Sequence, residues 1–113
     1  MNDIKWSTSE KKIARRAFDT ALDRALEMIL ADFKSKAAAA ATPSEMWDIG
    51  DELQRQRKEI DRTFDYRYSQ LLLVFAVLIR KGYLDEEQLA GLSEEKIEEI
   101  RRFLAWHEKP SCD

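Results

Sequence analysis

Apolar residues in the first third of the chain recur at helical spacing. Leu22, Leu26, Ile29 and Phe33 follow one another at intervals of four, three and four residues, which places them on one face of a helix. Ser7 and Glu10 form a capping box, in which each side chain accepts a hydrogen bond from the other residue's backbone N–H. A line of small apolar residues widens the face: Ala14, Ala17, Ala21 and Ala25. We expect one long helix over residues 8–41.

A second amphipathic segment begins at Thr42. Thr42 is an N-cap residue, Pro43 occupies the first helical position, and Glu45 completes another capping box. Gly50 lies inside this helix, where glycine lowers helix stability by about 1 kcal/mol relative to Ala. It also leaves room for another backbone or a bulky ring. The apolar stripe consists of Met46, Ile49, Leu53, Ile60 and Phe64. We expect a turn where FDYRYS, residues 64–69, breaks the periodicity.

The last third of the chain predicts shorter helices. A helix is expected over residues 67–81. The segment QLLLVFAVLIRKG is apolar all round, which is typical of a helix buried on every side, and Gly82 suits the C′ position. Asp85 and Gln88 form a capping pattern for a short helix that ends at Gly91. The last helix begins at Ser93 and reaches residue 107, and its inward residues are expected to be Ile97, Ile100, Phe103 and Leu104.

These elements predict an all-α protein with two long antiparallel helices and a small helical head. We interpret residues 1–113 as a single domain. Residues 1–66 form a long hairpin, or dimerisation stalk, residues 67–107 form the head, and residues 108–113 form a disordered tail.

The length of the first helix favours a dimer. A helix of ~34 residues is ~51 Å long, whereas a compact domain of this size is ~35 Å across. An isolated hairpin would leave one apolar flank in water. The economical arrangement is an elongated two-fold homodimer whose long helices form an intermolecular bundle. The alternative is a monomer whose first helix kinks and folds back. In the dimer, the stalk residues at the interface are expected to be Leu22, Leu26, Ile29, Phe33, Leu53 and Ile60.

Composition restricts the function further. The net charge of −3 argues against a general nucleic-acid binder, which needs a basic face. Cys112 is the single cysteine, so an intramolecular disulfide is impossible and a cytoplasmic location is the default. The longest apolar run, residues 71–79, is far shorter than the roughly 20 residues of a bilayer span, so we expect no membrane insertion.

Residue patterns that support catalysis are missing from the sequence. His107 is the single histidine, near the end of the last helix, and we interpret it as a solvated side chain. Cys112 lacks the electropositive setting that activates a thiol. The Glu-x-x-His pattern of metal sites in helical bundles is absent, and three distant glycines make no phosphate loop. We expect no catalytic residue, no metal and no cofactor.

Two charged clusters have ordinary explanations. The basic cluster comprises Lys11, Lys12, Arg15 and Arg16. Positive side chains are unfavourable at a helix N-terminus, so the cluster could serve to bind an acidic partner. The simpler interpretation is that it forms a solvated face of the helix. It also supports one alternative function, a small helical nucleic-acid-associated regulator. The acidic cluster is favourably placed, because negative side chains stabilise the N-terminus of a helix. It comprises Glu94, Glu95, Glu98 and Glu99.

The most informative group of residues lies on the second helix. Trp47 and Asp51 are four residues apart and share a face, whereas Arg57 lies nearly on the opposite side from Asp51. An antiparallel second copy could bring Asp51 and Arg57 together across a two-fold axis. Indole and guanidinium groups are also frequent in binding hot spots. The alternative is that Trp47 belongs to the core and that Arg57 pairs with Asp61 at i+4.

An ordered set of segments resembles the fluorescence recovery protein family from about Trp6 to Leu104. The segments are Trp6-Ser7, MWDIGDEL (46–53), RKEID (57–61), FDYRYSQLLLVFAVLIRKG (64–82) and LAGLSEEKIEEI (89–100). The resemblance implies an elongated all-α dimer that is not an enzyme. It also implies that Trp47, Asp51 and Arg57 occupy the positions of a patch used in dimerisation and activity.

The function implied by the resemblance is regulatory. Cyanobacterial members bind the photoactivated orange carotenoid protein, chiefly through its C-terminal domain, and speed its return to the resting form. This return ends energy quenching at the phycobilisome. The resemblance therefore implies a location that is cytoplasmic or peripheral to the thylakoid membrane.

Two positions depart from the family pattern. Gly50 stands where a histidine is expected beside the patch, and Leu73 stands where a phenylalanine is expected on the head surface. Both changes remove aromatic surface, which tends to dominate interface energetics. The alternative partner is therefore a related carotenoid-binding domain or another protein, in an organism without phycobilisomes.

Overall fold

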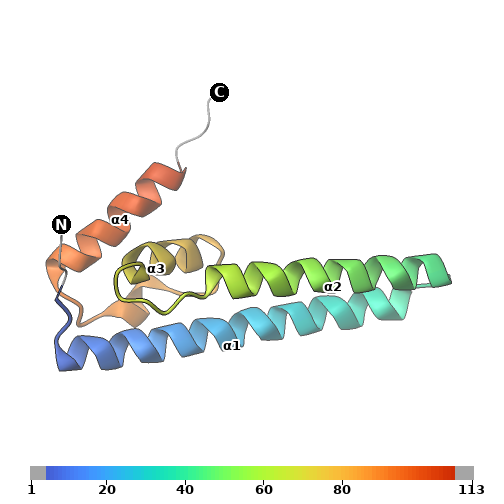
Figure 1. The fold of residues 1–113 in the computed structure, drawn as a ribbon, viewed down its shortest axis with the longest axis horizontal. Helices are drawn as coiled ribbons and strands as arrows, with labels where there is room; N and C mark the ends of the chain where they lie inside the picture. Colours follow the sequence, from blue (N-terminus) through green and yellow to red (C-terminus); the bar gives the residue numbers. More distant parts are fainter. Residues whose placement is uncertain (1–4, 109–113) are drawn as a thin grey trace.

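The computed structural model describes residues 5–108 and consists of a helical hairpin with a small helical head (Figure 1). The elements are α1 (Thr8–Ala39), α2 (Pro43–Thr63), α3 (Leu71–Arg80), the short 3₁₀ helix η1 (Glu86–Leu89) and α4 (Glu94–Glu108). The expected all-α class is confirmed. The predicted tail begins one residue too early, because Glu108 still belongs to α4. The rest of that prediction, which includes Pro110 and Cys112, lies outside the described residues.

The hairpin is long because α1 is one unbroken helix. Its capping box forms as expected: Ser7 Oγ accepts from the Glu10 N–H, and the Glu10 carboxylate accepts from the Ser7 N–H. The alternative in which this helix kinks and folds back is therefore wrong. The chain measures 52 × 38 × 25 Å, and its radius of gyration is 17.0 Å, against the ~13 Å of a compact domain of this length.

Helix ends differ from the expected ones where local stop signals are weak. The first helix ends at Ala39 rather than residue 41, because Ala40 is extended and leads into the cap of α2. The head helix α3 starts at Leu71 rather than 67 and ends at Arg80 rather than 81. Residues 64–70 instead form a connection without helix, which confirms the expected turn at FDYRYS. The last helix starts at Glu94, because Ser93 stands before it and accepts from the Lys96 N–H.

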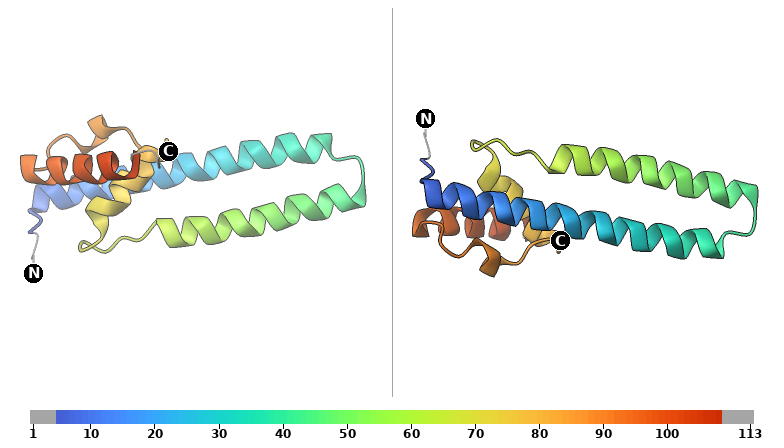
Figure 2. Two further views of the ribbon diagram at one scale, coloured as in Figure 1. Left: turned by 90° about the horizontal axis from the view of Figure 1, so that it is seen from above. Right: turned by 90° about the horizontal axis from the view of Figure 1, so that it is seen from below.

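The head packs on the first half of α1, at the end where α2 finishes, and the other end of the hairpin projects away from it (Figures 1 and 2). Small alanines on α1, which include Ala14 and Ala21, are fully buried and let the head approach closely. The largest fully buried side chains are Phe75, Leu71, Leu78, Leu84, Leu89 and Ile100. Ile97, Phe103 and Leu104 pack against this core, as expected for the inward face of the last helix.

Two glycines fix the turns of the head. Gly82 has φ +85° and closes a Schellman motif, in which its N–H donates to the Ile79 carbonyl and the Tyr83 N–H donates to the Leu78 carbonyl. Gly91 has φ +107°, and a Cβ atom built on it would overlap Ile13 Cδ1 of α1. Gly91 therefore permits the turn before α4 to lie directly against α1.

Gly91→Ala should destabilise the protein by about 2–3 kcal/mol, because the backbone penalty adds to the cost of moving the Ile13 side chain away from the new Cβ. The matched control is Gly82→Ala, which also has positive φ but has nothing within 4 Å of the added Cβ. The control should cost about 1 kcal/mol. Urea unfolding of the two variants measures the difference, and equal losses would contradict the close approach.

Candidate protein-binding surface

The free end of the hairpin presents an apolar groove. The groove has a volume of about 710 Å³, and α1 and α2 both contribute walls. We call it the hairpin groove, and it is lined by Phe33, Ala37, Ala40, Ala41, Thr42, Pro43, Met46, Trp47, Ile49 and Gly50. Leu26, Leu30 and Met46 on the hairpin are each about half exposed. Contiguous exposed apolar surface of this kind marks interaction sites on soluble proteins.

Trp47 is the largest apolar group of the groove, and 69% of it is exposed. The alternative that placed Trp47 in the core of the chain is therefore wrong. Gly50 lies one turn further along, and no atom lies within 4 Å of a Cβ built on it. The missing side chain leaves this part of the groove open.

Asp51 and Arg57 are both exposed on α2. Within residues 5–108 neither side chain takes part in a hydrogen bond or ion pair, so the alternative pair between Arg57 and Asp61 does not form. Their neighbours do pair along the helix: Arg55 pairs with Glu52, and Arg62 pairs with Glu59. Opposite charges are thus available at Asp51 and Arg57 for a partner.

The predicted stalk residues have few neighbours in the single chain. Leu22, Ile29, Phe33, Leu53 and Ile60 are half-buried, and Leu26 is exposed. No residue of α2 is fully buried. An amphipathic helix gains most of its stability from packing its apolar face, so the single chain leaves α2 poorly supported.

Leu73 lies on α3 and is half-buried. It lines a second groove, of about 290 Å³, where α2 leads into α3, together with Val74 and Val77. The rim of this groove is polar and includes Arg62 and Asp65. Leu73 thus lies on the head, apart from the hairpin groove.

Part of the basic cluster has a structural role. Arg15 pairs with Asp19 at 3.4 Å and lies 4.5 Å from the ring centre of Tyr66, and Lys11 lies 5.4 Å from that of Tyr68. Arg15 and Lys11 therefore hold the connection between α2 and α3 against α1. This use weakens the interpretation of the cluster as a nucleic-acid site.

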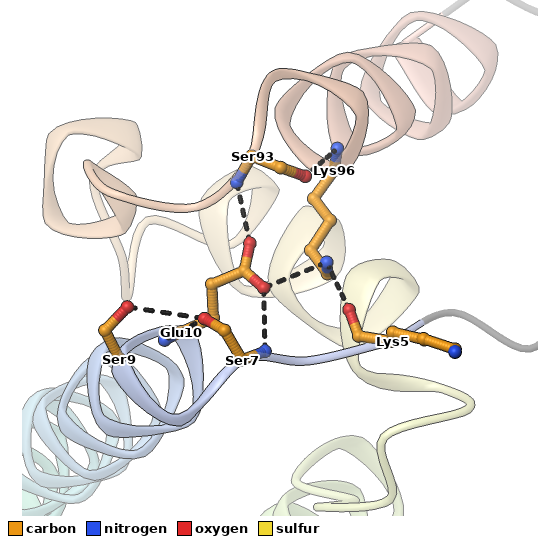
Figure 3. A network of polar contacts seen from close by, with 6 residues as sticks. All are labelled: Lys5, Ser7, Ser9, Glu10, Ser93 and Lys96. Atoms are coloured by element: carbon orange, nitrogen blue, oxygen red, sulfur yellow. Dashed lines mark hydrogen bonds and ion pairs between the residues drawn. The ribbon is translucent and has the colours of Figure 1, made fainter.

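A buried ion pair between the two ends of the chain was not expected from the sequence (Figure 3). Lys96 Nζ lies 3.1 Å from Glu10 Oε1, and the two side chains are only 9% and 10% exposed. The same carboxylate accepts hydrogen bonds from the Ser7 N–H and from the Ser93 N–H. Glu10 was interpreted only as part of a local capping box, and nothing in the sequence links it to a lysine 86 residues away.

Several effects act on the pKa of Glu10. Burial raises the pKa, but hydrogen bonds from the Ser7 and Ser93 N–H groups and the ammonium of Lys96 outweigh it and hold the pKa below the usual 4.5. The folded state therefore binds the Glu10 proton more weakly than the unfolded state does. The stabilisation from this carboxylate is complete above the unfolded pKa and is lost as the pH falls.

Stability should consequently decrease as the pH falls below about 4.5, and Glu10→Gln should remove part of that decrease. Thermal unfolding at a series of pH values measures both curves. Asp19→Asn, which alters an exposed carboxylate, is the control and should leave the slope unchanged. Identical slopes for wild type and Glu10→Gln would contradict the linkage.

Aromatic rings form a continuous seam beside this ion pair. Successive ring centres lie 4.8–6.3 Å apart along the order Tyr68, Tyr66, Phe18, Phe64 and Tyr83. We call this line the aromatic seam. Burial, reinforced by the nearby Tyr68, raises the pKa of Tyr66 to about 12, so its hydroxyl stays neutral at physiological pH. The seam joins α1, the connection 64–70 and the end of α3.

Among residues 5–108, no three or more His, Cys, Asp or Glu side chains come together in a group that could hold a metal ion. No helix in the same residues is long and apolar enough to cross a membrane. His107, for which we expect no catalytic role, belongs to α4. The fold thus defines an all-α hairpin-and-head protein, and its most prominent surface is suited to binding another protein.

Comparisons with known proteins narrow this class. A family model described as "Photoprotection regulator fluorescence recovery protein" matches residues 6–104. The fluorescence recovery protein of Synechocystis sp. PCC 6803 is 32% identical over 96 residues, which are 85% of this chain and 88% of that protein. The chain belongs to the fluorescence recovery protein family.

Solved structures agree with this assignment. The structure of the Fremyella diplosiphon fluorescence recovery protein has a TM-score of 0.84 at 33% identity, and the match covers 90% of this chain and 99% of that one. The structure of the Synechocystis sp. PCC 6803 protein has a TM-score of 0.85 at 31% identity, with coverage of 89% and 99%. The similarity therefore extends over both the hairpin and the head.

Proposed function

We propose that this chain is a non-enzymatic regulator that binds the activated orange carotenoid protein and accelerates its return to the resting state. The observation that carries the proposal is the hairpin groove, an open apolar surface whose largest wall is an exposed tryptophan. Membership of a family of photoprotection regulators supports the choice of partner. In this proposal the C-terminal domain of the carotenoid protein is the binding region, and recovery ends quenching at the phycobilisome.

The regulator is proposed to work as a two-fold homodimer. The unpaired side chains of Asp51 and Arg57 support this, because an antiparallel α2 from a second copy could supply a partner for each. The half-buried stalk residues of α1 and α2 would be covered in the same interface. Dimerisation would thereby give α2 the packing that the single chain lacks.

Acceleration requires differential binding. A protein shifts a partner between two states only as far as it binds them unequally, and it accelerates the change only by binding the transition state more tightly than the activated state. An apolar surface with a few charged groups at its edge can discriminate between two shapes of a partner. No cofactor or covalent step is needed for this action.

The test is the dark recovery of a photoactivated orange carotenoid protein, followed by its absorbance. The chain should increase the recovery rate at substoichiometric to equimolar concentration, and Trp47→Ala should reduce that increase at least about tenfold, because truncated interface tryptophans commonly cost 2 kcal/mol or more. Trp106→Ala is the matched control, since Trp106 is 75% exposed but lies on α4. No acceleration at excess protein would contradict the proposal.

A different client is the second candidate, and Gly50 is the observation that favours it. Gly50 leaves open a part of the groove that a larger side chain would fill, so the surface differs in shape from that of the family pattern. The same recovery assay separates the two candidates. Acceleration supports the orange carotenoid protein, whereas an intact dimer without acceleration supports another protein client.

A further inference from the structure

The chain segment before α1 crosses the head as a short strap. We define the N-terminal strap as residues 5–7, which precede the first helical residue, Thr8. The indole of Trp6 lies against the aromatic seam, with its ring centre 5.4 Å from that of Tyr68. Ser7 is fixed at the start of α1 by its capping box, whereas the positions of Lys5 and Trp6 depend on contacts with the rest of the head.

Lys96 makes the main contacts with the strap (Figure 3). Its Nζ donates to the Lys5 carbonyl at 2.6 Å and lies 5.0 Å from the ring centre of Trp6. Glu10 holds the same Nζ at 3.1 Å and also accepts from the Ser7 N–H. One ammonium group on α4 therefore binds both the backbone and the ring of the strap.

One feature of Trp6 opposes the closed position. The indole Nε1 is buried, and it has no hydrogen-bond acceptor within residues 5–108. A buried donor without an acceptor costs free energy, and that cost is recovered when the group reaches water. The closed position of the strap is thus stabilised by the Lys96 ammonium and destabilised by the unsatisfied indole N–H of Trp6.

We propose that the N-terminal strap is a conformational device that opens and closes over the aromatic seam, and that Lys96 controls it. In the closed state Lys96 binds Lys5 and Trp6, and Glu10 keeps the ammonium in place. In the open state the indole donates to water, and the side of Tyr68 that Trp6 covers becomes exposed. The helices keep their packing in both states, because Trp6 is only partly buried and packs on the edge of the core rather than inside it.

The first test measures the exposure of Trp6 by acrylamide quenching of its fluorescence. Trp47→Phe and Trp106→Phe leave Trp6 as the single tryptophan of the full chain. In that background, Glu10→Gln/Lys96→Ala should increase the quenching constant at least about threefold over Glu10→Gln alone, with a red-shifted emission and unchanged far-ultraviolet circular dichroism. The Glu10→Gln background avoids a buried unpaired carboxylate.

Arg101→Met is the matched control, because it removes an exposed cation of α4 that pairs with Glu86 and does not contact the strap. It should leave the quenching constant unchanged. A Lys96→Ala variant whose Trp6 stays as protected as in Glu10→Gln would overturn the proposal. Such a result would make the strap a fixed part of the core.

The second test uses the wild-type chain, so it does not depend on how a variant folds. Hydrogen exchange of the Trp6 indole N–H, followed by NMR, should be at least about tenfold faster than exchange of the backbone amide of Phe75, which is fully buried in α3. Exchange of both protons at one common rate would show that the indole reaches water only on global unfolding. That outcome would also overturn the proposal.

Discussion

Reversal of the charge at Arg57 is expected to separate the proposed dimer into single chains of 13.2 kDa. A two-fold axis repeats each contact, so Arg57→Glu would place two glutamates opposite two Asp51 carboxylates. Loss of two charge-assisted contacts and gain of two repulsions should weaken association at least about 100-fold. Light scattering at micromolar concentration measures the mass directly.

Two further variants make this result specific. Arg55→Glu makes the same charge change on roughly the opposite side of α2, and it should leave the dimer intact. Asp51→Arg combined with Arg57→Glu exchanges the two charges and should restore the dimer. A dimer that survives Arg57→Glu, or a double variant that stays monomeric, would reject the contact between Asp51 and Arg57.

Removal of the buried ammonium group should cause the largest loss of stability. Lys96→Met keeps most of the side-chain volume but leaves the Glu10 carboxylate buried without its cation. Breaking a buried ion pair in this way costs about 3–5 kcal/mol. Chemical unfolding should show this loss, and the far-ultraviolet circular dichroism of the remaining folded protein should be unchanged.

A double-mutant cycle separates the pair from its surroundings. Glu10→Gln/Lys96→Met should recover part of the stability lost by Lys96→Met, because no unpaired carboxylate then remains buried. Arg101→Met at the exposed pair with Glu86 should cost no more than about 1 kcal/mol. Equal losses for the buried and the exposed pair would mean that water reaches Glu10 and that the pair is not desolvated.

Local signals in the sequence were sufficient for most of the secondary structure. The capping boxes at Ser7 and Thr42 depend on residues three positions apart, and both form as expected. The C′ position of Gly82 is equally local. The expected ends of the first helix and of α3 were less accurate, since the alanine run carries no stop signal and the connection 64–70 is held by contacts with α1.

The placement of the binding surface was only partly predictable. Spacing put Trp47 and Asp51 on one face of α2, but spacing could not decide between core and surface for Trp47. The tertiary arrangement decides it, because the head covers only the first half of α1 and leaves the free end of the hairpin uncovered. The pair of Glu10 and Lys96 could not be predicted at all, since only the folded head brings residues so distant in sequence together.

The second helix carries a consequence for the behaviour of the protein in the cell. A helix whose side chains are at best half-buried in one chain has a low local unfolding free energy and gains order from whatever covers it. In the proposed dimer, mass action would make the order of α2 depend on protein concentration: the helix would fray in single chains and stay ordered in paired ones. A cell could therefore tune this regulator through its expression level alone, with no modification of the chain.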